Sequence, residues 1–220
     1  MPSSTVEDYI KQLWVEQQAA GAELVPMGRL AAAMGVVPGT ATSMVKTLAD
    51  SGLVNYEPRS GARLTRGGEQ LALHVLRRHR LLEVFLVKVL GMDWSEVHDE
   101  AEHLEHVISD KVLERIDDLL GRPSVDPHGD PIPSPKGKMI AAPLLPLAEA
   151  PLNHRLRIAR VTDQDAPFLQ FLNRAGLMPD TQVTITSREP LADSITLKTA
   201  ANPALTLGTA AAHKILVQGA

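Results

Sequence analysis

The apolar residues near the start of the chain recur every three or four positions, which is the spacing of an α-helix. They are Val6, Tyr9, Ile10, Leu13 and Trp14. Ser4 followed by Glu7 fits a capping box, and Gly21 is a typical helix end. The pattern therefore predicts a first helix between Ser4 and Gly21, with Asp8 near its start.

Two shorter helical patterns follow, and a proline opens each of them. Pro26 begins a helix that ends around Gly35, and Pro38 begins another that ends at Gly52. Two short helices joined by a tight turn are typical of a helix-turn-helix. Residues 53–64 then predict a hairpin of two short strands around a turn rich in proline and glycine. A hairpin directly after a helix-turn-helix predicts a winged helix.

Long helical patterns dominate the middle of the chain. Thr65 is a suitable cap for a helix that continues to Leu90 and ends at Gly91, and residues 94–120 predict a further helix. Residues 81–90 contain more apolar side chains than one stripe needs, so this helix is expected to bury a second face. A homodimer interface is the simplest explanation.

Proline and glycine mark a change of character in residues 121–151. Eight of the 16 prolines lie between Pro123 and Pro151, which predicts an ordered turn followed by a linker. Beyond it, alternation of apolar and polar residues predicts five short strands. They are expected at residues 156–161, 182–186, 194–197, 205–207 and 215–217. Short strands at this density indicate a small β-barrel.

Composition limits the class of protein without identifying it. The 220 residues are 44% hydrophobic and 22% charged, which is ordinary for a globular protein. No apolar run is long enough to span a bilayer and the start is unlike a signal peptide, so we expect a cytoplasmic protein without membrane contact. The chain has no cysteine, which excludes disulfides, thiol catalysis and cysteine-ligated zinc. The net charge is −4, and residues 71–122 hold 11 acidic and 7 basic side chains.

The same acidic segment carries seven side chains of the types that bind metal ions. They are His79, Glu83, His98, Glu102, His103, Glu105 and His106. His79 and Glu83 are four residues apart and therefore share one helix face. At helical spacing the later donors fall on one sector, except His103, which points elsewhere. Imidazole and carboxylate donors without a thiolate suit manganese, iron(II), cobalt or zinc.

Two functional interpretations remain open on these residues alone. Paired carboxylates and imidazoles also activate water, so one interpretation is a di-metal hydrolase. The winged helix favours the other, a DNA-binding protein that responds to metal. The other histidines are expected to be structural or surface residues: His74, His103, His128, His154 and His213.

Several motifs occur in a recognisable order after the winged helix. RHRLLE at residues 78–83 precedes VHDEAEHLEH at 97–106, and DPHGDPIP at 126–133 precedes AHKILV at 212–217. In this order the motifs resemble those of the DtxR/MntR (diphtheria toxin repressor/manganese transport regulator) family. The resemblance covers essentially the whole chain.

The resemblance implies a mainly α fold with α+β parts. A winged helix-turn-helix DNA-binding domain is expected at residues 1–70 and a helical metal-binding and dimerisation domain at residues 71–140. A Pro-rich linker at residues 141–151 leads to a FeoA-like, Src-homology-like β-barrel at residues 152–220. The implied function is a metal-dependent transcriptional repressor of metal-uptake genes, not an enzyme, that binds an inverted-repeat operator in double-stranded DNA as a homodimer.

The resemblance also implies two metal sites per chain. One consists of His79, Glu83 and His98, and the other of Asp8, Glu102, Glu105 and His106. Iron-responsive members of the family carry Met and Cys where this chain has Asp8 and Glu102, whereas manganese regulators carry Asp and Glu. Manganese(II) is therefore the expected metal, with iron(II) as the alternative.

Three further positions bear on these sites. Manganese regulators usually carry a Glu one turn after the Asp, and this chain has Lys11 there. Two separate sites are therefore expected instead of one binuclear cluster. The barrel supplies a ligand in longer relatives, and a loose alignment places Gln164 and Asp165 nearest to that position.

The expected DNA contacts lie on the two helices of the helix-turn-helix and on the wing. They are Arg29, Pro38, Gly39, Thr40, Thr42, Ser43, Lys46, Arg59 and Arg63. Hydroxyl side chains donate hydrogen bonds to phosphates and contact thymine methyl groups, and the basic side chains neutralise phosphates.

Overall fold

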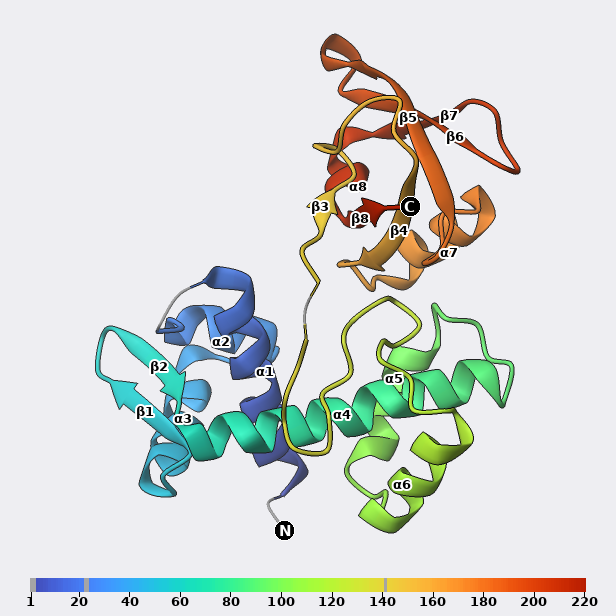
Figure 1. The fold of residues 1–220 in the computed structure, drawn as a ribbon. Helices are drawn as coiled ribbons and strands as arrows, with labels where there is room; N and C mark the ends of the chain where they lie inside the picture. Colours follow the sequence, from blue (N-terminus) through green and yellow to red (C-terminus); the bar gives the residue numbers. More distant parts are fainter. Residues whose placement is uncertain (1–2, 22–23, 141) are drawn as a thin grey trace. The chain divides into compact units, whose positions relative to one another are not determined.

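The computed structural model describes residues 3–21, 24–140 and 142–220, and it divides into two compact units (Figure 1). Unit 1 contains Met1–His79, Glu105–Ile108 and Pro133–Lys138. Unit 2 contains Arg80–Leu104, Ser109–Ile132 and Met139–Ala220.

Unit 1 contains the predicted winged helix. Its elements are α1 (Ser4–Ala20), α2 (Met27–Ala33), α3 (Pro38–Asp50), β1 (Val54–Glu57), β2 (Gly61–Leu64) and the first part of α4 (Arg66–Lys88). The two strands pair antiparallel, with Val54 opposite Leu64. Ile10, Leu30 and Leu48, one from each of the first three helices, are fully buried. The helices thus bury the apolar faces that their spacing predicted.

The start of α1 differs by one residue from the prediction. Ser3, not Ser4, is the N-cap, because Ser3 is extended and its side-chain oxygen accepts a hydrogen bond from the backbone N–H of Val6 at 3.4 Å. Gly21 ends the helix in the left-handed conformation, as expected.

The helix predicted over residues 94–120 is two helices, α5 (Val97–Glu105) and α6 (Asp110–Leu119). The break follows from Ser109, which is extended and caps α6 by accepting a hydrogen bond from the N–H of Val112. His106 therefore lies in the turn after α5, not on a continuous helix.

The rest of unit 2 is built on one antiparallel sheet in the order β3-β8-β4-β5-β6-β7. The strands are β3 (Leu145–Pro146), β4 (Leu156–Val161), β5 (Gln182–Glu189), β6 (Ser194–Thr199), β7 (Leu205–Gly208) and β8 (Ile215–Gly219). All five predicted strands are present. The short helices are α7 (Ala166–Ala175), η1 (Pro190–Ala192) and α8 (Thr209–His213).

Four of these elements were not predicted from the sequence: strand β3 and the short helices α7, η1 and α8. Helix α7 follows β4 and buries Leu169 and Leu172 in the core of unit 2. Strand β3 falls within residues 141–151, the expected linker, where it pairs with β8, and Leu147 just after it is fully buried.

Within the described residues, no helix combines the length and the apolar character needed to cross a membrane.

Candidate metal centre

Three of the predicted ligands converge within unit 1. Asp8 lies on α1, Glu105 is the last residue of α5, and His106 follows it. Each offers one ligand atom, and these atoms lie within 4.8 Å of one another. His106 Nε2 is 2.8 Å from Asp8 Oδ1 and 3.4 Å from Glu105 Oε1. The fold thus brings together residues that are almost a hundred positions apart in the sequence.

Glu7 orients the His106 ring. His106 Nδ1 lies 2.7 Å from Glu7 Oε2, and Arg78 Nη2 donates to Glu7 Oε1 at 2.7 Å. Glu7 and Arg78 are both buried, so this pair is held in place by its surroundings. A carboxylate that accepts one imidazole N–H leaves the other ring nitrogen to face a metal ion. Nε2 is that nitrogen here.

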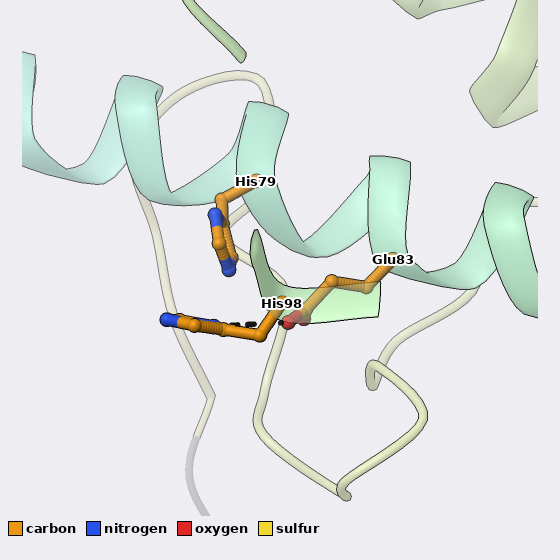
Figure 2. Close-up of side chains that lie close together, drawn as sticks. All are labelled: His79, Glu83 and His98. Carbon is orange, nitrogen blue, oxygen red and sulfur yellow. Dashed lines mark ion pairs between the residues drawn. The ribbon is translucent and has the colours of Figure 1, made fainter. Parts of the chain in front are cut away.

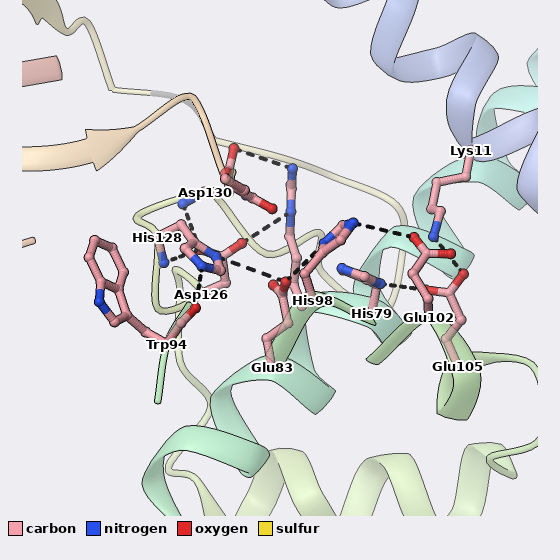
Figure 3. Close-up of polar contacts among 12 residues, drawn as sticks. Lys11, His79, Glu83, Trp94, His98, Glu102, Glu105, Asp126, His128 and Asp130 are labelled. Carbon is pink, nitrogen blue, oxygen red and sulfur yellow. Dashed lines mark hydrogen bonds and ion pairs between the residues drawn. The ribbon is translucent and has the colours of Figure 1, made fainter. Parts of the chain in front are cut away.

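Both oxygens of Glu105 are engaged (Figure 3). Oε1 accepts a hydrogen bond from Lys11 Nζ at 2.7 Å, and Oε2 accepts one from His79 Nδ1 at 2.7 Å. Glu105 is completely buried, and Lys11 is 8% exposed. This bond fixes the orientation of the His79 ring.

Two further predicted ligands, His79 and His98, form a donor group with Glu83. Figure 2 shows His79 and Glu83 on one face of α4, as their spacing of four residues predicts. In unit 2, His98 Nδ1 is 3.5 Å from Glu83 Oε1, and His98 Nε2 is 3.9 Å from Glu102 Oε1. Glu83 is buried, whereas His98 is partly exposed. His103 is exposed, consistent with its exclusion from the ligand sector.

A third group of donors, Glu83, Asp126 and His128, was missed by sequence reasoning, which took His128 as structural. His128 is fully buried, stacks on Trp94 and donates from Nε2 to the Trp94 carbonyl at 2.9 Å. This bond leaves a lone pair on His128 Nδ1, which makes no hydrogen bond in the described part of the chain. Nδ1 lies 3.9 Å from Glu83 Oε1 and 4.0 Å from Asp126 Oδ1. The only sequence signal was the Asp-x-His spacing in the turn.

The electrostatics of this third group favour a cation. Burial raises the pKa of Asp126 well above its usual range, and the nearby charges of Glu83 and Asp130 raise it further, against the opposing charge of Arg80. Asp126 Oδ1 also accepts hydrogen bonds from the N–H groups of His128 and Asp130. A buried carboxylate with a raised pKa is a group that a bound cation would stabilise in its charged form.

Asp165 belongs to none of the groups of His, Asp and Glu donors found among the described residues. The Gln164 side chain donates to Asp130 Oδ2 at 3.1 Å, and Asp165 is the exposed N-cap residue of α7. Arg160 contributes an ion pair of 2.5 Å to the same Asp130. Gln164 therefore takes part in the contact between the turn and the sheet of unit 2.

The predicted DNA contacts lie on α2, α3 and the wing. Seven of the nine residues are exposed, and Thr42 and Arg63 are partly exposed. Thr42 donates to the Pro38 carbonyl at 2.7 Å, and Arg29 forms an ion pair with Glu16. Arg59 has a φ of 71°, which places it in the turn of the hairpin in the left-handed conformation.

Three family models match the chain in sequence order. The iron dependent repressor N-terminal DNA binding domain matches residues 1–62, and the iron dependent repressor metal binding and dimerisation domain matches residues 65–134. The FeoA domain matches residues 145–219. Together with the winged helix and the donor groups, these matches define a metal-dependent, DNA-binding regulator.

Individual relatives narrow the class to one family. The iron-dependent repressor IdeR of Mycobacterium tuberculosis is 30% identical over 193 residues, which cover 82% of this chain and 83% of that protein. The regulator MntR of Lysinibacillus sphaericus is 34% identical over 120 residues, 54% of this chain and 84% of that protein. A solved structure of a manganese-dependent transcriptional repressor in complex with manganese is 37% identical, with a TM-score of 0.86 and coverage of 98% of this chain and 100% of that chain. This chain belongs to the DtxR/MntR family of metal-dependent, DNA-binding repressors.

Proposed function

We propose that this chain is a manganese(II)-activated repressor that binds an inverted-repeat operator in double-stranded DNA as a homodimer and controls metal-uptake genes. The observation that carries the proposal is the convergence of Asp8, Glu105 and His106. One of these donors lies on the first helix of the DNA-binding part of the chain, so metal binding is connected directly to that part. Such a protein acts on DNA and hence in the cytoplasm.

The proposal includes two metal sites per chain, which the donor groups support. We assign Asp8, Glu105 and His106 to one site, with Glu102, one helical turn before Glu105, as a further ligand. We assign the second site to the donors around Glu83. These are His79 and His98, as the sequence predicts, with Asp126 and His128 as additional candidates. We propose residues 1–70 as the DNA-binding domain, residues 71–140 as the metal-binding and dimerisation domain, and residues 152–220 as the FeoA-like domain. Residues 141–151, the Pro-rich segment before the FeoA-like domain, include strand β3.

The donors fit manganese(II). All of them are carboxylate oxygens or imidazole nitrogens, and a site without thiolate or thioether sulfur suits this hard ion. The buried His128 Nδ1 and the raised pKa of Asp126 support a cation at the donors around Glu83. Relatives named as manganese-dependent repressors support the same choice.

The proposed mechanism is a shift between two conformations. A bound divalent ion supplies positive charge that neutralises the carboxylates of Asp8, Glu102 and Glu105. With these side chains held together, α1 is fixed, and α3 of the same unit is fixed with it. Two α3 helices at a constant spacing in a dimer fit successive major grooves. The coupling free energy between two sites is typically ~1–3 kcal/mol. It arises only if metal binds one of the two conformations more tightly than the other.

Calorimetric titration with manganese(II) tests the assigned sites. We expect two ions per chain for the unaltered protein and one for Glu105→Gln. The exposed residue Glu100 on the same helix gives the matched control, since Glu100→Gln should retain both ions. Binding of two ions per chain by Glu105→Gln would show that Glu105 is not a ligand and would rule out the first site.

The second candidate function is an iron(II)-responsive repressor, which the similarity to IdeR favours. Half-maximal DNA binding in anaerobic, metal-buffered solutions separates the two. We expect activation by manganese(II) at a free concentration at which free iron(II) has little effect. Activation by iron(II) at a free concentration at which manganese(II) has little effect would show that the protein responds to iron. A di-metal hydrolase finds no support in the relatives, which are named as repressors and regulators.

A further inference from the structure

Lys11 occupies an unusual place for a lysine. It lies on α1 one turn after Asp8, and its side chain is only 10% exposed. The ammonium nitrogen is 2.7 Å from Glu105 Oε1, and the Glu105 carboxylate is completely buried. Lysine is almost never buried unless it is paired, so this ion pair is a built feature of unit 1.

The pair uses the oxygen that a metal ion would need. Of the two Glu105 oxygens, Oε2 is held by His79, and Oε1 lies 3.4 Å from His106 Nε2. That nitrogen in turn is 2.8 Å from Asp8 Oδ1. An ion shared by Asp8, His106 and Glu105 would therefore bind the same oxygen that Lys11 contacts.

The neighbouring ion pairs show that Lys11 is the cation that neutralises the Glu105 carboxylate. Arg78 is paired with Glu7 at 2.7 Å, whereas the Lys11 ammonium is paired with Glu105. A divalent ion and an ammonium on one carboxylate oxygen would repel each other strongly in a site with little water. The two cations therefore exclude each other at Oε1.

We propose that Lys11 is a resident cation of this metal site. Its ammonium stabilises the buried Glu105 carboxylate when metal is scarce, and manganese(II) must displace it from Oε1 to bind. Lys11 thus raises the metal concentration at which the site fills, and it holds Glu105 in place until then. The inference rests on the proposed function, because it takes Glu105, Asp8 and His106 as ligands.

Substitution of Lys11 tests the displacement directly. Lys11→Leu removes the charge and offers no metal ligand, and Lys11→Arg keeps the charge as the matched control. Competition with a fluorescent chelator at constant pH measures the affinity for manganese(II). We expect Lys11→Leu to bind about tenfold more tightly or better, and Lys11→Arg to remain close to the unaltered protein.

Thermal unfolding supplies an independent measurement. In chelator, Lys11→Leu should unfold at a lower temperature than the unaltered protein, because Glu105 is left buried without its cation. Saturating manganese(II) should remove most of this difference. Lys11→Gln can hydrogen-bond to Glu105 and should show the same tighter affinity if Lys11→Leu fails to fold.

The results also separate this inference from the proposed function. If Glu105→Gln leaves manganese binding unchanged, the site itself is wrong and the role of Lys11 falls with it. If Glu105→Gln weakens binding but Lys11→Leu and Lys11→Gln bind manganese no more tightly than the unaltered protein, the site stands and Lys11 is only a structural partner of Glu105.

Discussion

His106 shows how a single neighbouring residue orients a proposed metal ligand. Its Nδ1 bonds to Glu7, which Arg78 fixes in turn, so Nε2 is directed at Asp8 and Glu105. Partners of this kind set the tautomer and the orientation of a ligating imidazole, and their loss typically costs 10- to 100-fold in metal affinity.

We therefore predict that Glu7→Gln weakens manganese(II) binding by roughly 10- to 100-fold without removing a ligand. Calorimetric titration measures the change. Glu16→Gln on the same helix is the control, since Glu16 pairs with Arg29, away from the donors. Equal affinities of the two variants would show that Glu7 does not orient His106.

We expect that removing the negative charge of Asp126 stabilises the metal-free protein. Burial and the charges of Glu83 and Asp130 raise its pKa, so the ionised form is costly. We predict that Asp126→Asn increases the free energy of unfolding in chelator by about 1 kcal/mol, and that manganese(II) then adds less stability than before. The control is Asp118→Asn, at an exposed residue paired with Arg122. It should change the free energy of unfolding by less than about 0.5 kcal/mol. A destabilised Asp126→Asn in chelator would contradict the account.

At the scale of elements, α3 and the wing form the surface expected to meet DNA. Lys46 is exposed on α3, and phosphate neutralisation by lysine is independent of base sequence. We predict that Lys46→Gln weakens binding to operator and random DNA alike and lowers the salt dependence of binding by about one ion per subunit. Fluorescence anisotropy over a series of salt concentrations measures both. Lys88→Gln, outside the winged helix, should leave the slope unchanged, and a slope unaltered in Lys46→Gln would remove Lys46 from the interface.

The turn over residues 126–132 packs closely against β4. The N–H of Val161 donates to the carbonyl of His128 at 2.8 Å, and Gly129 has a φ of 89°. A Cβ at Gly129 would lie 2.0 Å from the carbonyl oxygen of Ala159. This close approach places His128 and Asp126 beside Glu83.

We predict that Gly129→Ala destabilises unit 2 by about 3 kcal/mol or more, since both strain and displacement of the backbone contribute. Gly176→Ala is the control, because Gly176 also has a positive φ but a methyl group there would meet nothing within 4 Å. Its cost should be about 1 kcal/mol. Urea unfolding followed by Trp94 fluorescence, with Trp14 replaced by Phe, reports on unit 2, and equal costs would exclude the close approach as the cause.

These elements also show what the sequence can and cannot predict. The winged helix, α4 and five strands follow from apolar spacing and from turn residues, because each element has a strong local pattern. The break between α5 and α6 depends on one capping residue, Ser109, inside an otherwise helical pattern. Strand β3 has only two residues, one of them a proline, so it forms through pairing with β8 and not through local preference.

The proposed ligands also divide into a group that was predicted from the sequence and a group that was not. The grouping of Asp8 with Glu105 and His106 came from the family resemblance, and the structure brings these residues together. The group of Glu83, Asp126 and His128 had no equivalent signal. It depends on the packing of the turn against β4 and on the bond of His128 to Trp94, which are tertiary contacts that spacing along the chain does not contain.

For the whole molecule, the central proposal is that metal binding by Asp8, Glu105 and His106 controls DNA binding. These three residues all belong to unit 1, and their donor atoms lie within 4.8 Å of one another. Asp8 lies on the first helix of the DNA-binding part, whereas Glu105 and His106 lie almost a hundred positions later in the sequence. A metal ion held by these donors would tie that helix to residues outside the winged helix.

The most direct test of this account is the affinity for DNA with and without metal. Duplexes selected from a random pool in manganese(II) provide the operator, and fluorescence anisotropy measures binding in buffered manganese(II) and in chelator. We predict binding roughly 5- to 150-fold tighter with manganese(II), the range of typical allosteric couplings, and loss of this difference in Glu105→Gln. Equal binding in chelator and in manganese(II) would contradict the central claim.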